Sequence, residues 1–270
     1  MSGKLKPSLD CKNPFQDLKI ASWDPLRRVQ RSPCPLCGRS RKYYCYDCYV
    51  LVGVTRELIP TVALPVKIDI VKHKEEASGK STSAHAKILS PDWVTIYQYP
   101  DMPKYDKTKT VLIYPKEGSL TVEELVASVK GSSSSSARST PLKELERVVF
   151  IDSTWSQSRG MCIHDNLSDL VCVQLKDAVT CFWRTQWESK HYLATIEAVY
   201  YFVKEYHDHS STQAYDGEYD NLLYYFAYQY NVVQGAISQR EENMQRKRPA
   251  VEDTTEDKPS QARKHPKTAQ

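Results

Sequence analysis

Four cysteines near the amino terminus form the most specific chemical pattern in this chain of 270 residues. Cys34 and Cys37 make one CxxC pair, Cys45 and Cys48 make a second, and seven residues separate the pairs. Two such pairs can present four thiolates to one tetrahedral ion, and zinc is the usual occupant. Four protein ligands close the coordination sphere, so the zinc that we predict is structural. Four reduced cysteines in a loop and a pair of disulfides are the alternatives.

Basic and aromatic residues surround these cysteines. They are Arg31, Arg39, Arg41, Lys42, Tyr43 and Tyr44. Cations that pair with phosphates and rings that stack on bases are typical of RNA-binding surfaces. The alternative is a basic face that is merely solvated.

A carboxylate follows the most apolar run of the chain. The segment VVFIDSTW, residues 148–155, reads as a buried strand that ends in Asp152. In open α/β sheets, ligands bind beyond the carboxyl ends of the strands, where Asp152 could accept a proton or a hydrogen bond. In the alternative interpretation, Asp152 and Thr154 cap the following turn and Trp155 belongs to the core.

Other polar candidates lie on three further segments. Glu197 falls in the first turn of a predicted helix, where an acidic side chain is already favoured by the helix dipole. Thr195 is expected to be a cap as well as a candidate ligand. Ser81 or Thr82 could cap another helix and leave its backbone N–H groups for a carboxylate or phosphate. Arg184 offers a guanidinium to a phosphate or to a cofactor carboxylate.

Strands and helices that alternate along the chain must position these residues. We predict strands over residues 64–71, 94–97, 111–114, 148–151 and 171–175 and helices over 81–89, 121–129, 195–207 and 219–237. The apolar run 148–151 is typical of a strand that is buried on both faces. Thr121 followed by Glu124 is a capping-box pattern. The alternation predicts an α/β fold with a largely parallel sheet and flanking helices.

The composition divides the chain into a domain and two polar ends. Residues 1–30 are mostly polar and are expected to be loosely ordered. Residues 239–270 hold no aromatic residue and are expected to form a disordered basic tail. One domain is predicted over residues 31–238, with a zinc module at 31–50 and a flexible Ser-rich loop at 130–141.

The overall composition excludes a wholly disordered chain, because 40% of the residues are hydrophobic. No apolar run reaches the roughly 18 residues of a membrane-spanning helix, so no membrane partner is expected. The start, MSGKLKPSLDCKNPF, lacks the apolar region of a secretory signal, which favours a reducing intracellular compartment. The net charge of +4 permits contact with nucleic acid without requiring it. No obligate protein partner is evident.

Two basic clusters in the tail, Arg246–Pro249 and Arg263–Lys267, resemble a bipartite nuclear import signal. The expected location is therefore the nucleus, with the cytoplasm as a second location. A solubilising tail that also touches RNA phosphates is the alternative.

The motif Asp-x-Thr-Trp after a hydrophobic strand resembles the signature of the DTW domain family. Other family motifs follow the same order along the chain, namely the paired CxxC, the His-containing segment Asp69–Leu89 and the helix start ATIEA at Ala194–Ala198. The resemblance spans roughly residues 31–237, and the pieces YCYDCYV, KIDIVKH, GKSTSAHAK, FIDSTW, TCFWR and YDNLL resemble its eukaryotic branch. Ala194 departs from the pattern, because the family usually has Ser there.

The resemblance implies a tRNA-uridine aminocarboxypropyltransferase. Such an enzyme transfers the 3-amino-3-carboxypropyl group of S-adenosylmethionine to N3 of a uridine in tRNA and releases 5′-methylthioadenosine. The branch resembled here acts on the D-loop. The family is related to the SPOUT methyltransferases, so a SPOUT-like, knotted α/β fold is also implied. An RNA methyltransferase of the same fold and a noncatalytic zinc-dependent RNA-binding protein are the competing hypotheses.

The implied reaction needs a group that removes the uridine N3 proton, and a carboxylate near the uracil is the natural candidate. Asp152 is expected to have that role as base or orienting group. The catalytic set that we predict is Asp152, Thr154, Trp155 and Glu197. Contacts to S-adenosylmethionine are predicted for Ser153, Thr195, Thr82 and Arg184.

Overall fold

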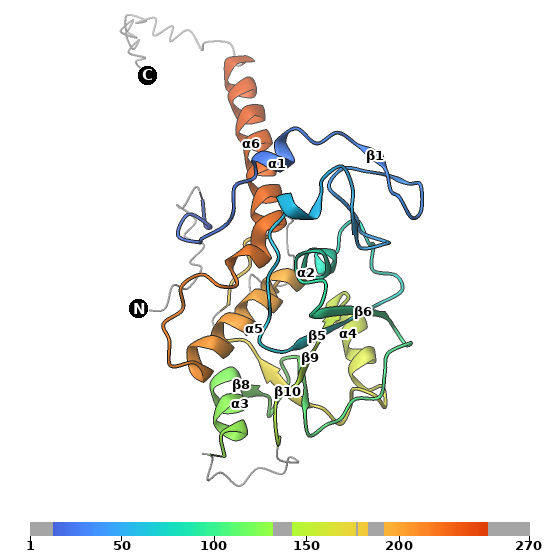
Figure 1. The fold of residues 1–270 in the computed structure, drawn as a ribbon, viewed down its shortest axis with the longest axis vertical. Coiled ribbons are helices and arrows are strands. Elements are labelled where there is room, and N and C mark those ends of the chain that lie inside the picture. The colour runs from blue at the N-terminus through green and yellow to red at the C-terminus, as the bar shows by residue number, and fades with distance from the viewer. Residues whose placement is uncertain (1–12, 132–141, 177, 183–191, 248–270) are drawn as a thin grey trace, which may run out of the picture. The chain divides into compact units, whose positions relative to one another are not determined.

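A parallel sheet of six strands forms the centre of the computed structural model, which describes residues 13–131, 142–176, 178–182 and 192–247 (Figure 1). The strands are β5 (Lys67–Lys72), β6 (Val94–Gln98), β7 (Thr110–Ile113), β8 (Leu120–Thr121), β9 (Arg147–Asp152) and β10 (Val171–Gln174). Their order is β6-β5-β9-β7-β10-β8, and every neighbouring pair is parallel. The predicted parallel α/β sheet is confirmed, and all carboxyl ends lie at one edge.

Helices cover both faces of this sheet. They are α2 (Ser83–Leu89), α3 (Val122–Val129), α4 (Trp155–Cys162), α5 (Thr195–Ser210) and α6 (Tyr224–Lys247), with a 3-10 turn η2 (Asp220–Leu223) before α6. Val148 and Phe150 of β9 belong to a core that includes Phe202 of α5. Val149 belongs to a second core, which includes Met161 of α4. Strand β9 is therefore buried on both faces, as its apolar run predicts.

Local sequence signals explain several of these elements. The predicted capping box opens α3, because the Thr121 amide donates to Glu124 Oε2 at 2.7 Å and the Glu124 amide donates to Thr121 Oγ1 at 3.1 Å. Strand β5 differs from its half-buried, alternating prediction: Asp69 is fully buried and accepts a 2.6 Å bond from Arg147 Nη1. Helix α4 is not among the predicted helices, because its sequence WSQSRGMC has no apolar periodicity.

The paired cysteines lie in a small module of short antiparallel strands. Its strands are β1 (Ser32–Pro33), β2 (Ser40–Arg41), β3 (Tyr44–Cys45) and β4 (Val50–Leu51), and the short helices α1 (Asp24–Arg27) and η1 (Arg56–Leu58) flank it. Each CxxC turn is followed at once by a residue with positive φ, Gly38 at 70° and Tyr49 at 56°. That conformation suits glycine and is costly for tyrosine, so contacts elsewhere must hold Tyr49 in place.

The two polar ends contain more structure than their composition indicates. Residues 1–30 are expected to be loose, yet Phe15 and Leu26 are buried, and the Phe15 ring packs edge-on against Phe226. Composition does not reveal two isolated apolar residues that are buried within a polar segment. The expected tail starts at Gln239, but helix α6 continues to Lys247. The chain divides into two units, one that ends at Val233 and one that starts at Gln234. No helix in the described ranges combines the length and apolarity needed to cross a membrane.

Candidate active site

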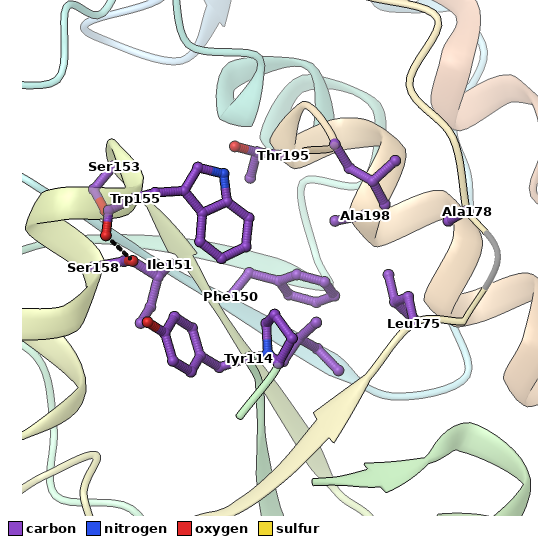
Figure 2. A pocket seen from close by; sticks show the side chains of 13 residues that line it. Tyr114, Phe150, Ile151, Ser153, Trp155, Ser158, Leu175, Ala178, Thr195 and Ala198 are labelled. Atoms are coloured by element: carbon purple, nitrogen blue, oxygen red, sulfur yellow. Dashed lines mark hydrogen bonds between the residues drawn. The ribbon is translucent and has the colours of Figure 1, made fainter. Parts of the chain in front are cut away.

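A cavity of about 260 Å³ lies beyond the carboxyl ends of β7, β9 and β10, beside the starts of α4 and α5 (Figure 2). Residues from these elements or directly after them line it, among them Tyr114, Phe150, Ser153, Trp155, Thr195 and Ala198. The place is the one that parallel α/β sheets generally use for ligands. Phe150 and Ala198 make part of the wall apolar, and the hydroxyls of Ser153 and Thr195 add polar groups.

Asp152, the last residue of β9, lies next to this cavity and is only 4% exposed. Its Oδ1 accepts a hydrogen bond from Thr195 Oγ1 at 2.7 Å, and its Oδ2 accepts one from Ser81 Oγ at 2.5 Å. Asp152 is not itself a lining residue, whereas Thr195 and the neighbouring Ser153 are. The carboxylate therefore reaches the contents of the cavity through the Thr195 hydroxyl.

Thr154 has a structural role at the start of α4. Its Oγ1 accepts a hydrogen bond from the Gln157 amide at 3.4 Å, and its own amide donates to Gln157 Oε1 at 3.1 Å. This reciprocal pair is a capping box. Thr154 is exposed and does not line the cavity; it has the capping role that the sequence offers as an alternative, and its catalytic role stays a prediction.

Aromatic rings form one wall of the cavity. The Trp155 ring lies 6.2 Å from the Tyr114 ring and 4.4 Å from the Tyr192 ring, measured between centroids. Ser158 Oγ donates to the Trp155 carbonyl at 2.9 Å and fixes this turn of α4 (Figure 2). Planar faces of this kind can stack on a nucleobase. The sequence analysis missed Tyr114, although its position directly after a strand could have identified it.

The start of α5 shows how the chain tolerates Ala194. Alanine has no side-chain acceptor for the first amides of the helix, which need partners. Thr82 supplies one from the loop before α2, because its Oγ1 accepts from the Ile196 amide at 3.1 Å. Thr82 is buried, does not line the cavity and makes this capping contact, and its contact with the cofactor stays a prediction.

Glu197 does not line the cavity but holds neighbouring segments together. Its carboxylate is buried and accepts three hydrogen bonds: from Thr180 Oγ1 at 2.7 Å, from the Cys181 amide at 2.6 Å and from the Ala194 amide at 2.8 Å. These bonds tie residues 178–182 to the start of α5. Burial outweighs them and raises the pKa of Glu197 from 4.5 to about 7. These bonds give Glu197 a positioning role, and its catalytic role stays a prediction.

The raised pKa predicts that Glu197 makes the stability depend on pH. Between the two pKa values the folded chain keeps a proton that the unfolded chain releases, so the free energy of unfolding falls as pH rises from 4.5 through about 7. Glu197→Gln cannot ionise and should lack this component. We expect wild type to lose about 2 kcal/mol relative to the variant between about pH 5.5 and pH 8. Urea unfolding at both pH values measures this, and parallel pH profiles would contradict the assignment.

The four cysteines of the module meet the requirements of a metal site. Their sulfur atoms all lie within 4.8 Å of one another, and the Sγ atoms of Cys37 and Cys45 are 3.7 Å apart. A tetrahedral site with Zn–S bonds of 2.3 Å has sulfur–sulfur edges of about 3.8 Å. All four are free thiols, so the disulfide alternative is not supported. The cluster can hold a metal ion.

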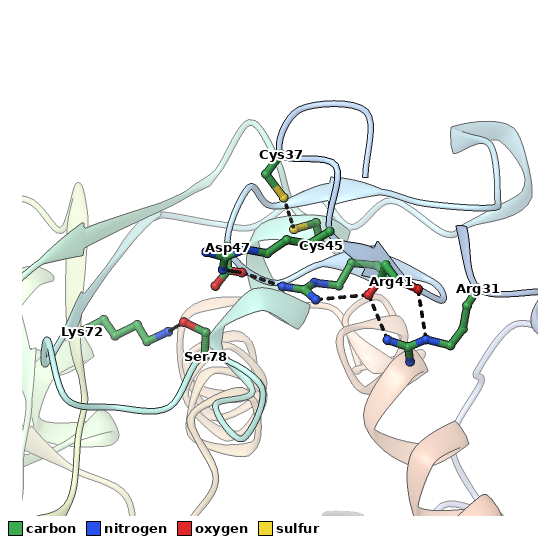
Figure 3. A network of polar contacts seen from close by, with 9 residues as sticks. Arg31, Cys37, Arg41, Cys45, Asp47, Lys72 and Ser78 are labelled. Atoms are coloured by element: carbon green, nitrogen blue, oxygen red, sulfur yellow. Dashed lines mark hydrogen bonds and ion pairs between the residues drawn. The ribbon is translucent and has the colours of Figure 1, made fainter. Parts of the chain in front are cut away.

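The basic residues around the cysteines mostly contact other residues of the module. Arg41 Nη2 and Arg39 Nη1 contact Asp47 Oδ2 at 2.7 and 3.0 Å, and Arg31 Nη2 donates to the Ser40 carbonyl at 2.9 Å (Figure 3). The Arg41 side chain is only 11% exposed. Its guanidinium is therefore used mainly to stabilise the module and not to bind a phosphate.

The two tyrosines of this group attach the module to the helices. Tyr44 Oη lies 2.7 Å from Nε2 of the buried His85 in α2, and the Tyr43 ring packs edge-on against Tyr228 of α6 at 5.5 Å. Burial lowers the pKa of His85 to about 3, so this imidazole is neutral. These rings are packing residues and do not form an exposed surface for base stacking. The remaining predicted ligand, Arg184, lies outside the described residues.

Comparisons with known proteins agree over most of the chain. Residues 42–234 match the family model described as DTW domain. A mouse protein named tRNA-uridine aminocarboxypropyltransferase 1 is 40% identical over 263 residues, which cover 85% of this chain and 86% of the relative. The rat protein of that name is 39% identical, with 83% and 85% covered, and the human protein is 38% identical, with 85% and 86% covered. No solved structure matches this chain significantly.

Proposed function

This chain belongs to the DTW domain family, and we propose that it is a tRNA-uridine aminocarboxypropyltransferase. The observation that carries the proposal is the 40% identity to an enzyme of that name, which extends over 85% of this chain and 86% of the relative. The family match over residues 42–234 includes the sheet and the residues that line the cavity. An enzyme is favoured over a noncatalytic RNA-binding protein, because the buried Asp152 and the half-buried Thr195 form a hydrogen-bonded pair beside the cavity.

The donor that we propose is S-adenosylmethionine, and the acceptor is N3 of a uridine in the D-loop of tRNA. A bond forms between N3 and the terminal carbon of the aminocarboxypropyl group, and the bond from that carbon to sulfur breaks. The leaving group is 5′-methylthioadenosine, and the N3 proton must pass to the enzyme. The apolar and aromatic lining of the cavity, with Phe150, Trp155 and Tyr114, supports the binding of a flat heterocycle.

Asp152 is the proposed acceptor of the N3 proton. Because the Thr195 hydroxyl lies between Asp152 and the cavity, the proton passes to Thr195 Oγ1 while the Thr195 proton moves to Asp152 Oδ1. Ser81 holds the second carboxylate oxygen and so fixes the orientation of Asp152. Ser153 and Trp155 contribute a hydroxyl and a stacking surface to the binding of the two substrates.

The metal that we propose for Cys34, Cys37, Cys45 and Cys48 is structural zinc. Support comes from the all-sulfur donor set and from spacings that match a tetrahedral zinc site. With four protein ligands, no position is left for a substrate. The zinc therefore has no chemical step to perform, and its effect on the reaction must act through the folding of the module.

The sheet order supports the SPOUT-like, knotted fold that the family relationship implies. Strand β9 lies between β5 and β7, both of which precede it in the chain. The chain must therefore return into the middle of the sheet, which is a connection of the kind that a knot requires.

We also propose that the basic clusters Arg246–Pro249 and Arg263–Lys267 direct import into the nucleus, with a second population in the cytoplasm. Their spacing on a polar tail supports this role. A fluorescent fusion that ends at residue 238 should lose its nuclear accumulation, and unchanged accumulation would reject the assignment.

The proposed acceptor position can be tested with unmodified tRNA transcripts. Purified protein and S-adenosylmethionine should produce 3-(3-amino-3-carboxypropyl)uridine in the D-loop, detected by mass spectrometry of nuclease fragments. Transcripts in which cytidine replaces the D-loop uridines should not react, whereas cytidine in place of anticodon-loop uridines should have no effect. Methylated uridine would instead favour the methyltransferase hypothesis. Binding of tRNA without any product would favour the noncatalytic one.

A further inference from the structure

The second cysteine turn of the module contacts the loop that leads from β5 to α2. Asp47, which Arg41 holds, interacts with the Ser78 side chain. The Ser78 hydroxyl oxygen accepts a 2.8 Å bond from Lys72 Nζ (Figure 3). Lys72 is buried, ends β5 and is the direct neighbour of Asp152 in the sheet register. A chain of polar contacts therefore runs from the module to the strand end beside Asp152.

Tyr46 contacts the same loop with its ring. A Cβ atom at Gly79 would lie 3.4 Å from Tyr46 Cζ and 3.5 Å from Tyr46 Oη, which is van der Waals contact. The Arg41 guanidinium lies 4.1 Å from the centre of that ring. Tyr46 thus packs on Gly79 while Arg41 packs on Tyr46.

The loop carries, within three residues of Gly79, two side chains that build the active site. Ser81 donates to Asp152 Oδ2 at 2.5 Å, and Thr82 accepts from the Ile196 amide at the start of α5. A shift of the loop would release the carboxylate and the helix start together. Displacements of about 1 Å at such positions can lower rates by about 100-fold.

We propose that Tyr46 and Asp47 are positioning residues, which hold the loop 78–82 against the module so that Ser81 and Thr82 keep Asp152 and the start of α5 in place. The cysteines on either side, Cys45 and Cys48, fix the turn that presents them. We call these contacts of Tyr46 and Asp47 with the loop 78–82 the brace. The effect of the brace on catalysis rests on the proposed function, but the brace itself can be tested without any turnover.

The test compares Tyr46→Ala with Tyr46→Phe in the full-length, zinc-loaded protein. Phenylalanine keeps the ring on Gly79 and alanine removes it. In the alanine variant we expect amide hydrogen exchange in residues 78–82 to be at least about tenfold faster, with exchange in β9 unchanged. At saturating tRNA, kcat should fall by about 10- to 100-fold, with little change in KM. The phenylalanine variant should match wild type in both.

Arg39→Ala is the matched control, because Arg39 contacts the same Asp47 carboxylate from a side chain that is 66% exposed. It should leave exchange in residues 78–82 unchanged. Should Tyr46→Ala lose zinc or fail to fold, Ser78→Ala removes the hydroxyl between Lys72 and Asp47 without altering the module. That variant should also accelerate exchange in residues 78–82.

Two results would overturn the proposal. One is exchange at the wild-type rate in residues 78–82 of the folded Tyr46→Ala and Ser78→Ala variants. The other is a raised KM for tRNA with kcat and exchange unchanged, which would make Tyr46 an RNA contact. A wild-type protein that transfers nothing to tRNA would refute the proposed function only, and the exchange data would still decide whether the brace exists.

Discussion

Asp152→Asn is expected to lower kcat by about 10²- to 10⁴-fold while the protein remains folded. Asparagine keeps the shape of the side chain and one acceptor oxygen, and a hydroxyl can rotate to accept from the new amide. The bonds with Ser81 and Thr195 can therefore be retained in altered form. The variant cannot take up the N3 proton, and the loss corresponds to about 3–5.5 kcal/mol in the activation free energy. Single-turnover rates with saturating tRNA and S-adenosylmethionine measure it.

Thr195 provides the matched pair of controls for that experiment. Thr195→Ser keeps the hydroxyl that faces both Asp152 and the cavity, so it should stay within a few-fold of wild type. Thr195→Val has nearly the same volume without the hydroxyl and should lose about 10- to 100-fold. An Asp152→Asn protein that binds both substrates and turns over at the wild-type rate would rule out Asp152 as the proton acceptor.

Removal of the metal is expected to have the second large effect. The module's own buried cluster contains only Cys34, Cys45 and Val52, which is too small a core to fold without a crosslink or an ion. We expect one zinc per chain. Chelation or Cys45→Ala should unfold the module and lower transfer by about 100-fold or more, because the brace on Ser81 is lost. Zinc content by elemental analysis and the rate of transfer are measured on the same samples.

Cys162→Ala is the control for a general effect of losing a thiol. Cys162 is half-buried at the end of α4 and lies outside the cysteine cluster, so the variant should keep its zinc and its rate. Zinc added back to the chelated wild type should restore activity, because the ligands remain in place. Full activity in protein shown to be free of metal would mean that the cysteines act as ordinary thiols.

The sequence predicts the architecture well where a local pattern decides it. The apolar run 148–151, the capping box at Thr121 and the alternation of strands with helices all have local physical causes. Helix α4 and the burial of β5 depend on partners that are distant in sequence. Asp69 occupies what looks like the polar position of a half-buried strand, and its bond with Arg147 favours its full burial.

The candidate site could be predicted in part, for a similar reason. The position of Asp152 follows from the strand that precedes it, but its partners Ser81 and Thr195 are 71 and 43 residues away in the chain. Glu197 and Thr82 have the chemistry of ligands, and their burial and hydrogen bonds also suit residues that hold the site together. Residue type and spacing alone do not distinguish these two roles.

The most direct test of the account follows two labels from S-adenosylmethionine to unmodified tRNA, one in the methyl carbon and one in the aminocarboxypropyl chain. The proposed function predicts that only the aminocarboxypropyl label enters tRNA, with release of one 5′-methylthioadenosine per label. Methyl label in tRNA, or no label from a folded, zinc-loaded protein that binds tRNA, would contradict it.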